Sequence, residues 1–336
     1  MPRHALLAAT LLALAPFAHA GCGDDDRLLL RSDNDVYGQA GQDENYSAGA
    51  YIAWVSPTVV GDGECLPGGV AWLDRATRWL RWGSGSERNL LLDYHHSIYT
   101  PRDGQRVDID PDDRPYAATM LFGVGQQVRD GDRLAVTRLQ LGLIGPSAQG
   151  EMAQDALHHL FGRERFKGWD NQIDDLPLVQ LSHDRLWRRA ARASVLGLES
   201  DRIHYLGASA GNARVDARAG VEWRWGIDLA DDFGSNPMRA AGDGLAPGAE
   251  ADADEEWDWH VFASLEARGV AHDITLDGHG DSHSVQRKEF VAEAGLGVVL
   301  THGPWRLAYG HYRRSREFDG QPAAPVYGSF TVSLDL

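Results

Sequence analysis

The segment Leu134–Leu143 constrains the fold most strongly, because its side chains alternate between apolar and polar with a period of two. In an extended strand the two sets point to opposite faces, which gives Leu139, Leu141 and Leu143 against Arg138, Gln140 and Gly142. Similar segments recur along the chain, about twelve in all: near 27–36, 46–56, 88–100, 115–128, 132–144, 177–189, 191–204, 205–227, 257–271, 285–300, 304–316 and 327–336. The pattern predicts an all-β protein.

The connections between these segments alternate in length. Short turns are predicted at 129–132, 189–190 and 301–304, and long polar loops at 101–114, 145–176, 228–256 and 272–284. An even number of strands joined in this way is typical of a transmembrane antiparallel β-barrel, and eleven Trp and ten Tyr suit its aromatic girdles. A soluble β-sandwich would also alternate, but it rarely has so many long strands with loops enlarged on one side. We therefore predict a transmembrane antiparallel β-barrel of about 12 strands, with a short helix in an outer loop.

The N-terminus indicates export. A basic start, an apolar run and the small-x-small site at 18–20 predict a signal peptide over residues 1–20. A lipoprotein acylated at Cys22 is the weaker interpretation, because His19 stands where an aliphatic residue is expected. Residues 21–336 are then a single outer-membrane barrel domain. Its two cysteines, Cys22 and Cys65, are predicted to form a disulfide in an oxidising compartment.

The charge of the chain bears on its partners. A net charge of -17 argues against nucleic acid as a partner. The expected surroundings are the outer membrane, and we expect a monomer.

Two short helices interrupt the strand pattern. Residues 69–81 have an amphipathic pattern, and so do residues 152–161 in a predicted outer loop. The apolar face of the second comprises Ala153, Ala156, Leu157, Leu160 and Phe161. His158 and His159 flank its opposite side about equally, so periodicity does not choose between them. Glu164 would return toward His158 if Gly162 reverses the chain.

Oxygen-bearing side chains gather where the first strand ends. Residues 32–35 carry Ser, Asp, Asn and Asp, which are hard ligands of the kind that Ca²⁺ prefers, although an Asx turn has the same composition. If the N-terminus is periplasmic, this strand end lies outside, together with loops 101–114 and 145–176. Ser47 at the start of the second strand lies at the same end.

Several short motifs occur together in this order. They are Asn34-Asp35, Tyr46-Ser47-x-Gly49, Asp113-Arg114-Pro115-Tyr116-Ala117, Gly145-Pro146, Gln154-x-x-x-His158 and Gly168-Trp169-Asp170-Asn171-Gln172. In combination they resemble the outer-membrane lipid A 3′-O-deacylases. Ala48 and Ala118 depart from the residues common in that family, Asn and Gly.

The resemblance implies a twelve-stranded barrel whose active site faces the cell exterior, between the barrel wall and a helical loop. Family members are Ca²⁺-dependent hydrolases that remove the 3′-linked acyloxyacyl group from the lipid A of lipopolysaccharide. Carried onto this sequence, the general base is His158 and the other catalytic positions are Asn34, Asp35 and Ser47. Asp35 and Glu164, with oxygen help from Asn34, would hold the Ca²⁺ ion.

Three further assignments concern the substrate and the nucleophile. Arg114, Arg102 and Tyr46 are the predicted substrate-binding residues, with the arginines toward the lipid A phosphates. Ser47 either positions a water or is itself the nucleophile; no G-x-S-x-G motif surrounds it, which favours water. The alternative functions are a calcium-dependent outer-membrane phospholipase and a non-catalytic, porin-like barrel.

Overall fold

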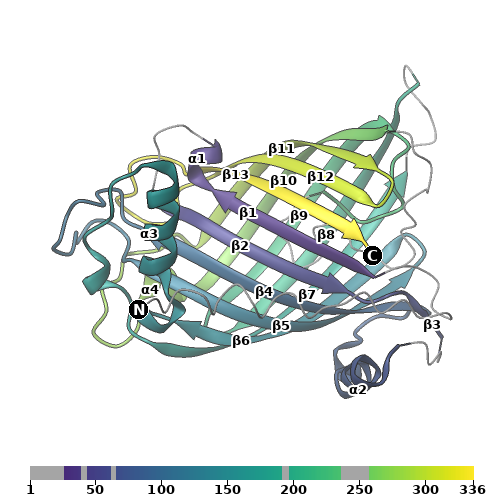
Figure 1. Ribbon diagram of the computed structural model, residues 1–336, viewed down its shortest axis with the longest axis horizontal. Helices are drawn as coiled ribbons and strands as arrows, with labels where there is room; N and C mark the ends of the chain where they lie inside the picture. The colour runs from purple at the N-terminus through teal and green to yellow at the C-terminus, as the bar shows by residue number, and fades with distance from the viewer. Residues whose placement is uncertain (1–25, 39–43, 62–65, 191–196, 236–256) are drawn as a thin grey trace, which may run out of the picture.

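Twelve long antiparallel strands close into a barrel in the computed structural model, which describes residues 26–38, 44–61, 66–190, 197–235 and 257–336 (Figure 1). They are β1 Arg27–Asn34, β2 Asn45–Val55, β4 Glu87–Thr100, β5 Ala117–Asp130, β6 Arg133–Ile144, β7 Leu176–Ala190, β8 Glu199–Gly211, β9 Arg214–Ile227, β10 Trp257–Asp273, β11 Phe290–His302, β12 Trp305–Arg314 and β13 Val326–Asp335. β1 pairs with both β2 and β13, and β2 pairs with β4, which closes the sheet. A two-residue strand, β3 (Val59–Val60), pairs with one end of β4. The predicted barrel is confirmed.

The two faces of each strand differ as the sequence predicts. Arg138 and Gln140 of β6 line an interior cavity, whereas Leu141, the next residue along the strand, is 52% exposed on the outer surface. Inside the barrel, arginines pair with carboxylates of other strands, as Arg218 of β9 does with Asp184 of β7 at 2.8 Å. None of the helices in the described residues is long and apolar enough to cross a membrane.

Short helices lie at both ends of the barrel (Figure 1). We call the end where β1 begins and β13 ends the terminal end, and the opposite end the loop end. The loop end carries α1 (Asp35–Gly38), α3 (Gly150–Phe161) and α4 (Ile274–Asp277), with the 3-10 turns η2 (Pro146–Ala148) and η3 (Trp169–Asn171) beside α3. α2 (Gly68–Ala76) and the turn η1 (Arg78–Leu80) lie at the terminal end. Both predicted helices are therefore confirmed.

One strand boundary is wrong in the prediction. β7 runs through Ala190, so 189–190 is no hairpin turn, and β8 does not end near 204 but continues to Gly211. The turn to β9 is at Asn212 and Ala213, where the Asn212 side chain accepts a hydrogen bond from the Val179 amide at 2.8 Å. The error arises because the end of β8 is rich in glycine and alanine and shows little alternation. A side chain at Gly207 would collide with the carboxylate of Asp184.

Some predictions fall on residues outside the described part of the chain. These are the signal peptide at 1–20 and the disulfide between Cys22 and Cys65.

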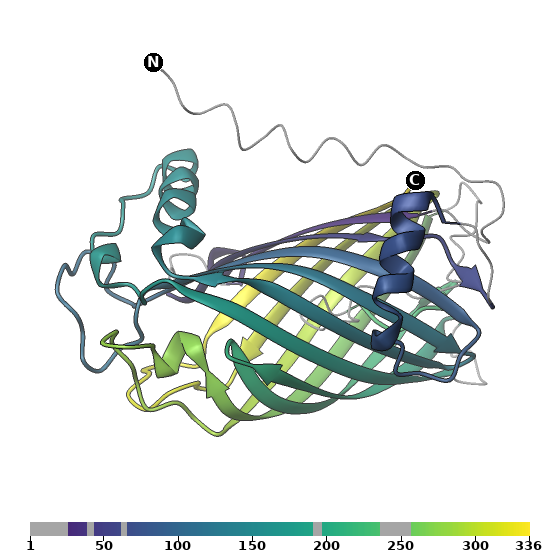
Figure 2. The same ribbon diagram turned by 90° about the horizontal axis from the view of Figure 1, so that it is seen from below.

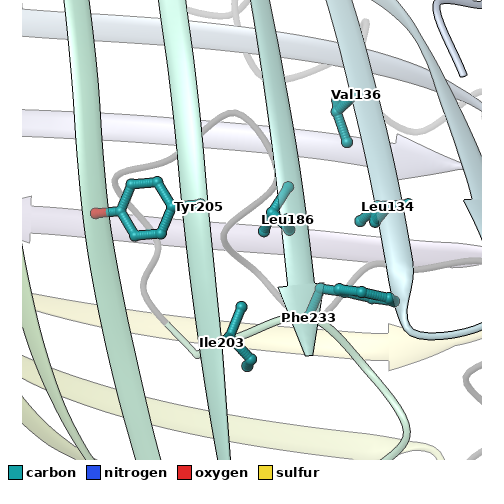
Figure 3. Packing of buried hydrophobic residues seen from close by; sticks show 6 residues of the cluster. All are labelled: Leu134, Val136, Leu186, Ile203, Tyr205 and Phe233. Carbon is teal, nitrogen blue, oxygen red and sulfur yellow. The ribbon is translucent and has the colours of Figure 1, made fainter. Parts of the chain in front are cut away.

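The loop after β9 is not among the loops at the loop end. Strand order puts it at the terminal end, and its described part, residues 228–235, turns into the barrel. We call these residues the plug segment. The side chain of Phe233 packs inside the barrel among inward-facing residues of β6, β7 and β8, as Figure 3 shows: Leu134, Val136, Leu186, Ile203 and Tyr205. The plug segment thus fills the lumen near this end.

Ion pairs hold the plug segment in place. The carboxylate of Asp232 is fully buried, where it pairs with Arg224 and accepts a hydrogen bond from Arg306 at 2.5 Å. Burial raises the pKa of this carboxyl, but the two guanidinium groups outweigh it and lower the pKa well below its usual range. The side chain of Asp231 pairs with Arg129 and Arg188 but is 57% exposed.

We expect Asp232→Asn to destabilise the barrel by about 3–5 kcal/mol, because it removes the buried charge that Arg306 pairs with and one of the two carboxylates around Arg224. Urea unfolding of the protein in lipid vesicles measures this. Asp231→Asn is the matched control: its exposed ion pairs contribute only about 0–1 kcal/mol. Equal effects of the two substitutions would contradict the proposed difference in burial.

Candidate functional site

α3 lies against the outer surface of the barrel wall at the loop end. It begins after Gln149 and ends at Gly162, and both residues have left-handed backbone conformations, with φ of 61° and 66°. Its buried side chains, Gln154 and His158, are one turn apart and lie on the same side of the helix. Of the predicted apolar face, Ala153 and Leu157 pack on the wall, whereas Leu160 and Phe161 are mostly exposed.

The two adjacent histidines have different environments. His158 is 5% exposed, and its Nδ1 lies 2.6 Å from the backbone carbonyl oxygen of Glu164. Because a carbonyl oxygen only accepts, Nδ1 carries the proton and the basic lone pair is on Nε2. The ring of Phe166 meets the His158 ring edge-on, with 5.1 Å between centroids. His159 is exposed.

The chain reversal at Gly162 produces this contact. The amides of Gly162 and Arg163 both donate to the His158 carbonyl, which ends the helix and turns the chain back. Glu164 thereby returns to His158 as the sequence predicts, although through its backbone carbonyl. Its carboxylate is exposed.

Gln154 joins α3 to the turn η3 that follows it. Its side-chain oxygen accepts a hydrogen bond from the indole of Trp169 at 2.8 Å, and both side chains are buried. Trp169 packs on the Tyr116 ring at 4.9 Å. These contacts fix the position of His158, one helical turn beyond Gln154.

A row of opposed residues crosses the wall beneath α3. Asn34 of β1 lies opposite Ala48 of β2, Ala48 opposite Ile98 of β4, and Ile98 opposite Ala118 of β5. The row is on the outward face, since Phe122, four residues beyond Ala118 on the same strand, is 58% exposed. With strands about 4.8 Å apart, Asn34 lies roughly 10 Å along the wall from Ile98.

Small side chains in this row let α3 approach closely. Ala48 and Ala118 are buried in one apolar cluster with Ile98, Trp169 and Ala148. A Cβ on Gly150 of α3 would lie only 2.4 Å from that of Ala118. Two of the positions that depart from the family pattern, Ala48 and Ala118, therefore form the surface on which the helix sits.

Ser47 lies beside this row at a β-bulge. The register of β2 with β4 shifts between Tyr46 and Ala48, and the buried hydroxyl of Ser47 forms a hydrogen bond with that of Thr100. Nearby on β4, the Nε2 of His96 bonds to the carbonyl of Ala148 at 2.8 Å. Sequence reasoning missed both residues: Thr100 meets Ser47 only because of the bulge, and His96 meets Ala148 through the fold of the loop after β6.

The Asn34-Asp35 pair forms a turn. The Asn34 side-chain oxygen accepts from the Val36 amide at 2.9 Å, and a carboxylate oxygen of Asp35 accepts from the Glu44 amide at 2.5 Å. Among the described residues, no group of three or more His, Cys, Asp or Glu side chains lies close enough together to hold a metal ion. Asn34, Asp35 and Ser47 thus share one rim of the wall, and the Glu164 carboxylate does not join them.

The predicted substrate-binding residues lie in different places. The buried guanidinium of Arg114 bonds to Thr275 at 3.0 Å and stacks on the Tyr99 ring, and the Tyr46 hydroxyl donates to Asp33 at 2.7 Å. Both Tyr46 and Arg114 line cavities, Tyr46 on the lumen side of the wall. Arg102 is exposed, as is the guanidinium of Arg106, which sequence reasoning missed.

A cleft separates the loop after β4 from η3. Its lining includes Asp103, Arg106 and Arg114 on the loop after β4, and Gly168 and Asn171 on the other side. The amide of Asn171 donates to the carbonyl of Val107 at 2.6 Å and ties the two loops together. The cleft thus gathers charged groups beside η3, whose Trp169 is bonded to Gln154 of α3.

Comparison with solved structures places the fold among outer-membrane barrels. LpxR from Salmonella typhimurium is 17% identical over 92% of this chain and 100% of that chain, with a TM-score of 0.73. The β domain of the Bordetella autotransporter BrkA is 12% identical over 94% of this chain and 100% of that chain, with a TM-score of 0.44.

Comparison with sequence families identifies the chain more directly. No curated protein matches it. The model of the family described as outer membrane protein LpxR matches residues 6–336, nearly the whole length. The closed barrel, the helix on its outer wall and this match lead to one conclusion: the chain belongs to the outer membrane protein LpxR family.

Proposed function

We propose that the protein is a calcium-dependent lipid A 3′-O-deacylase that hydrolyses the 3′-linked acyloxyacyl ester of lipopolysaccharide. The observation that carries the proposal is the environment of His158, which is buried on the helix that packs on the outward face of the barrel wall and has its Nδ1 held by the Glu164 carbonyl. A base on this face can meet a lipid that stays in the membrane. Membership of the LpxR family supports the same reaction, and in the proposed orientation the loop end faces the cell exterior.

The surface around α3 suits a substrate with acyl chains. Leu160 and Phe161 at the end of the helix are 73% and 60% exposed, and Met152 near its start is half exposed. Exposed apolar side chains at the membrane surface can contact hydrocarbon without the cost of facing water. On the loop after β4, Arg102 is the exposed guanidinium that we assign to a lipid A phosphate. The contacts predicted for Arg114 and Tyr46 stay predictions.

His158 is the general base in this mechanism. Its Nδ1–H donates to the Glu164 carbonyl, so Nε2 takes a proton from a water molecule as the water oxygen attacks the ester carbonyl carbon. When the ester C–O bond breaks, the imidazolium returns this proton to the leaving sugar oxygen. The products are the acyloxyacyl carboxylic acid and a free 3′-hydroxyl on the sugar. Ser47, held by Thr100, orients the water.

The donors for calcium are chemically suitable. Asp35 and Asn34 supply a carboxylate and an amide oxygen at the rim, which are hard ligands; Glu164, whose exposed carboxylate is separate from them in the described structure, is the second carboxylate that we predict on the loop after α3. Ca²⁺ bound there would polarise the ester carbonyl.

We expect His158→Ala to lower the deacylation rate by about 10²–10⁴-fold, the usual contribution of a positioned general base. Mass spectrometry of lipid A incubated with the purified protein measures the loss of the acyloxyacyl group. His159→Ala is the matched control and should keep nearly full activity, because its side chain is exposed. Unchanged lipid A alongside released lysophospholipid would favour a phospholipase instead.

Calcium removal gives a second test. A chelator should abolish deacylation and added Ca²⁺ should restore it. Asp35→Asn and Glu164→Gln should each raise the Ca²⁺ concentration needed for half-maximal activity, because each removes a charged ligand. Glu151→Gln, an exposed change on α3, should not. Full activity in the presence of chelator would refute the calcium dependence.

A further inference from the structure

The segment of residues 66–82, which contains α2 and η1, lies outside the barrel at the terminal end. Figure 2 shows α2 crossing the outer wall there, far from α3. We call this segment the tryptophan segment, because it carries Trp72, Trp79 and Trp82. The function proposed above makes no use of it.

Polar contacts attach the tryptophan segment to the outward face of β5. The amide of Gln126 donates to the Thr77 hydroxyl at 2.8 Å and to the Asp74 carboxylate at 3.2 Å, and its oxygen accepts from Arg81 at 3.2 Å. Gln126 is fully buried, although it lies on the same face of β5 as the exposed Phe122. The segment therefore covers the wall where the lipid-facing surface becomes polar.

The side of the segment that faces away from the wall is aromatic. Trp72, Trp79 and Trp82 are 65%, 52% and 44% exposed, whereas Leu80 is fully buried. Trp82 also packs against the ring of His183 on β7, with 5.2 Å between centroids. A segment surrounded by water would place its large apolar side chains on the wall and its polar ones outside. Here the exposed side carries the tryptophans.

The tryptophan segment is positively charged, whereas the chain as a whole is negative. The tryptophan segment has three arginines and one aspartate, in a chain of net charge -17. Arg81 forms an ion pair with that aspartate, Asp74, at 2.7 Å, so Arg75 and Arg78 make the segment positive. Both of these arginines lie on the exposed side with the tryptophans.

We propose that the tryptophan segment binds the phospholipid headgroup layer of the membrane at the terminal end, which is the periplasmic leaflet in the proposed orientation. Tryptophan prefers the boundary between headgroups and acyl chains, and arginine binds anionic phosphates. The segment continues the lipid-facing surface of β5, which places its exposed side beside the bilayer. The ligand of the segment is therefore anionic phospholipid. Contact with a protein in the aqueous phase is the alternative, and the two experiments below distinguish the two.

Fluorescence quenching locates the tryptophans. The full protein is placed in vesicles of phosphatidylcholine and phosphatidylglycerol that carry bromine on the acyl chains near the headgroup. The difference between wild type and Trp72→Phe/Trp79→Phe reports these two indoles, and we expect bromolipid to quench them and aqueous acrylamide to have little effect. Trp225→Phe, which removes an exposed indole from β9, is the lipid-facing control, and Trp54→Phe the buried one. Quenching of Trp72 and Trp79 by acrylamide but not by bromolipid would overturn the proposal.

Charge substitutions test the headgroup contact. Native mass spectrometry measures how much phosphatidylglycerol the protein retains in competition with phosphatidylcholine. Arg75→Gln/Arg78→Gln should lower the preference for phosphatidylglycerol by roughly tenfold or more, as expected when two arginines leave a membrane surface. Arg165→Gln/Arg316→Gln, which removes two exposed arginines at the loop end, should leave it unchanged. An equal loss in both variants, or in neither, would contradict the assignment.

Discussion

The pairing of β1 with β13 is the constraint on which the rest of the structure depends. Hydrocarbon offers no hydrogen bonds to backbone groups, so a sheet in a bilayer must have no open edge. The eight residues of β1 meet that requirement from Arg27 opposite Asp335 to Asn34 opposite Gly328. The same strand pairs on its other side with β2, which brings Asn34 level with Ala48 and starts the row of residues beneath α3. Closure of the barrel and placement of the candidate site are thus set by one strand.

Alternation made most of the fold predictable, because lipid on one side and charged residues on the other impose opposite requirements on successive side chains. The prediction failed where that requirement weakens. Gly207 and its neighbours at the end of β8 are small because the Arg218–Asp184 ion pair fills the space, so their sequence does not alternate. The plug segment escaped prediction for another reason: Phe233 has partners on three strands that are distant in sequence.

For the candidate site, residue types and family motifs identified the segments but not the contacts. Helical periodicity left His158 and His159 equivalent, and the register from Gln154 favoured His158. The structure gives the physical difference, since His158 is buried and meets the chain that returns after Gly162, whereas His159 is exposed. The partnership of Ser47 with Thr100 depends on a bulge, and the exposed position of the Glu164 carboxylate depends on a loop conformation; neither has a signal in the sequence.

Contacts inside the lumen stiffen the wall of the barrel. Phe233, Asp231 and Asp232 tie the inner faces of β6 to β9 and of β12 together, and Arg–carboxylate pairs continue across the lumen toward the loop end. A wall braced from within resists being flattened or sheared by the lateral pressure of the bilayer. The spacing between neighbouring strands beneath α3 then varies little. The distance between α3 and the alanines on which it packs therefore also stays nearly constant. The barrel thereby acts as a rigid support for α3 and for the candidate site on its outer surface.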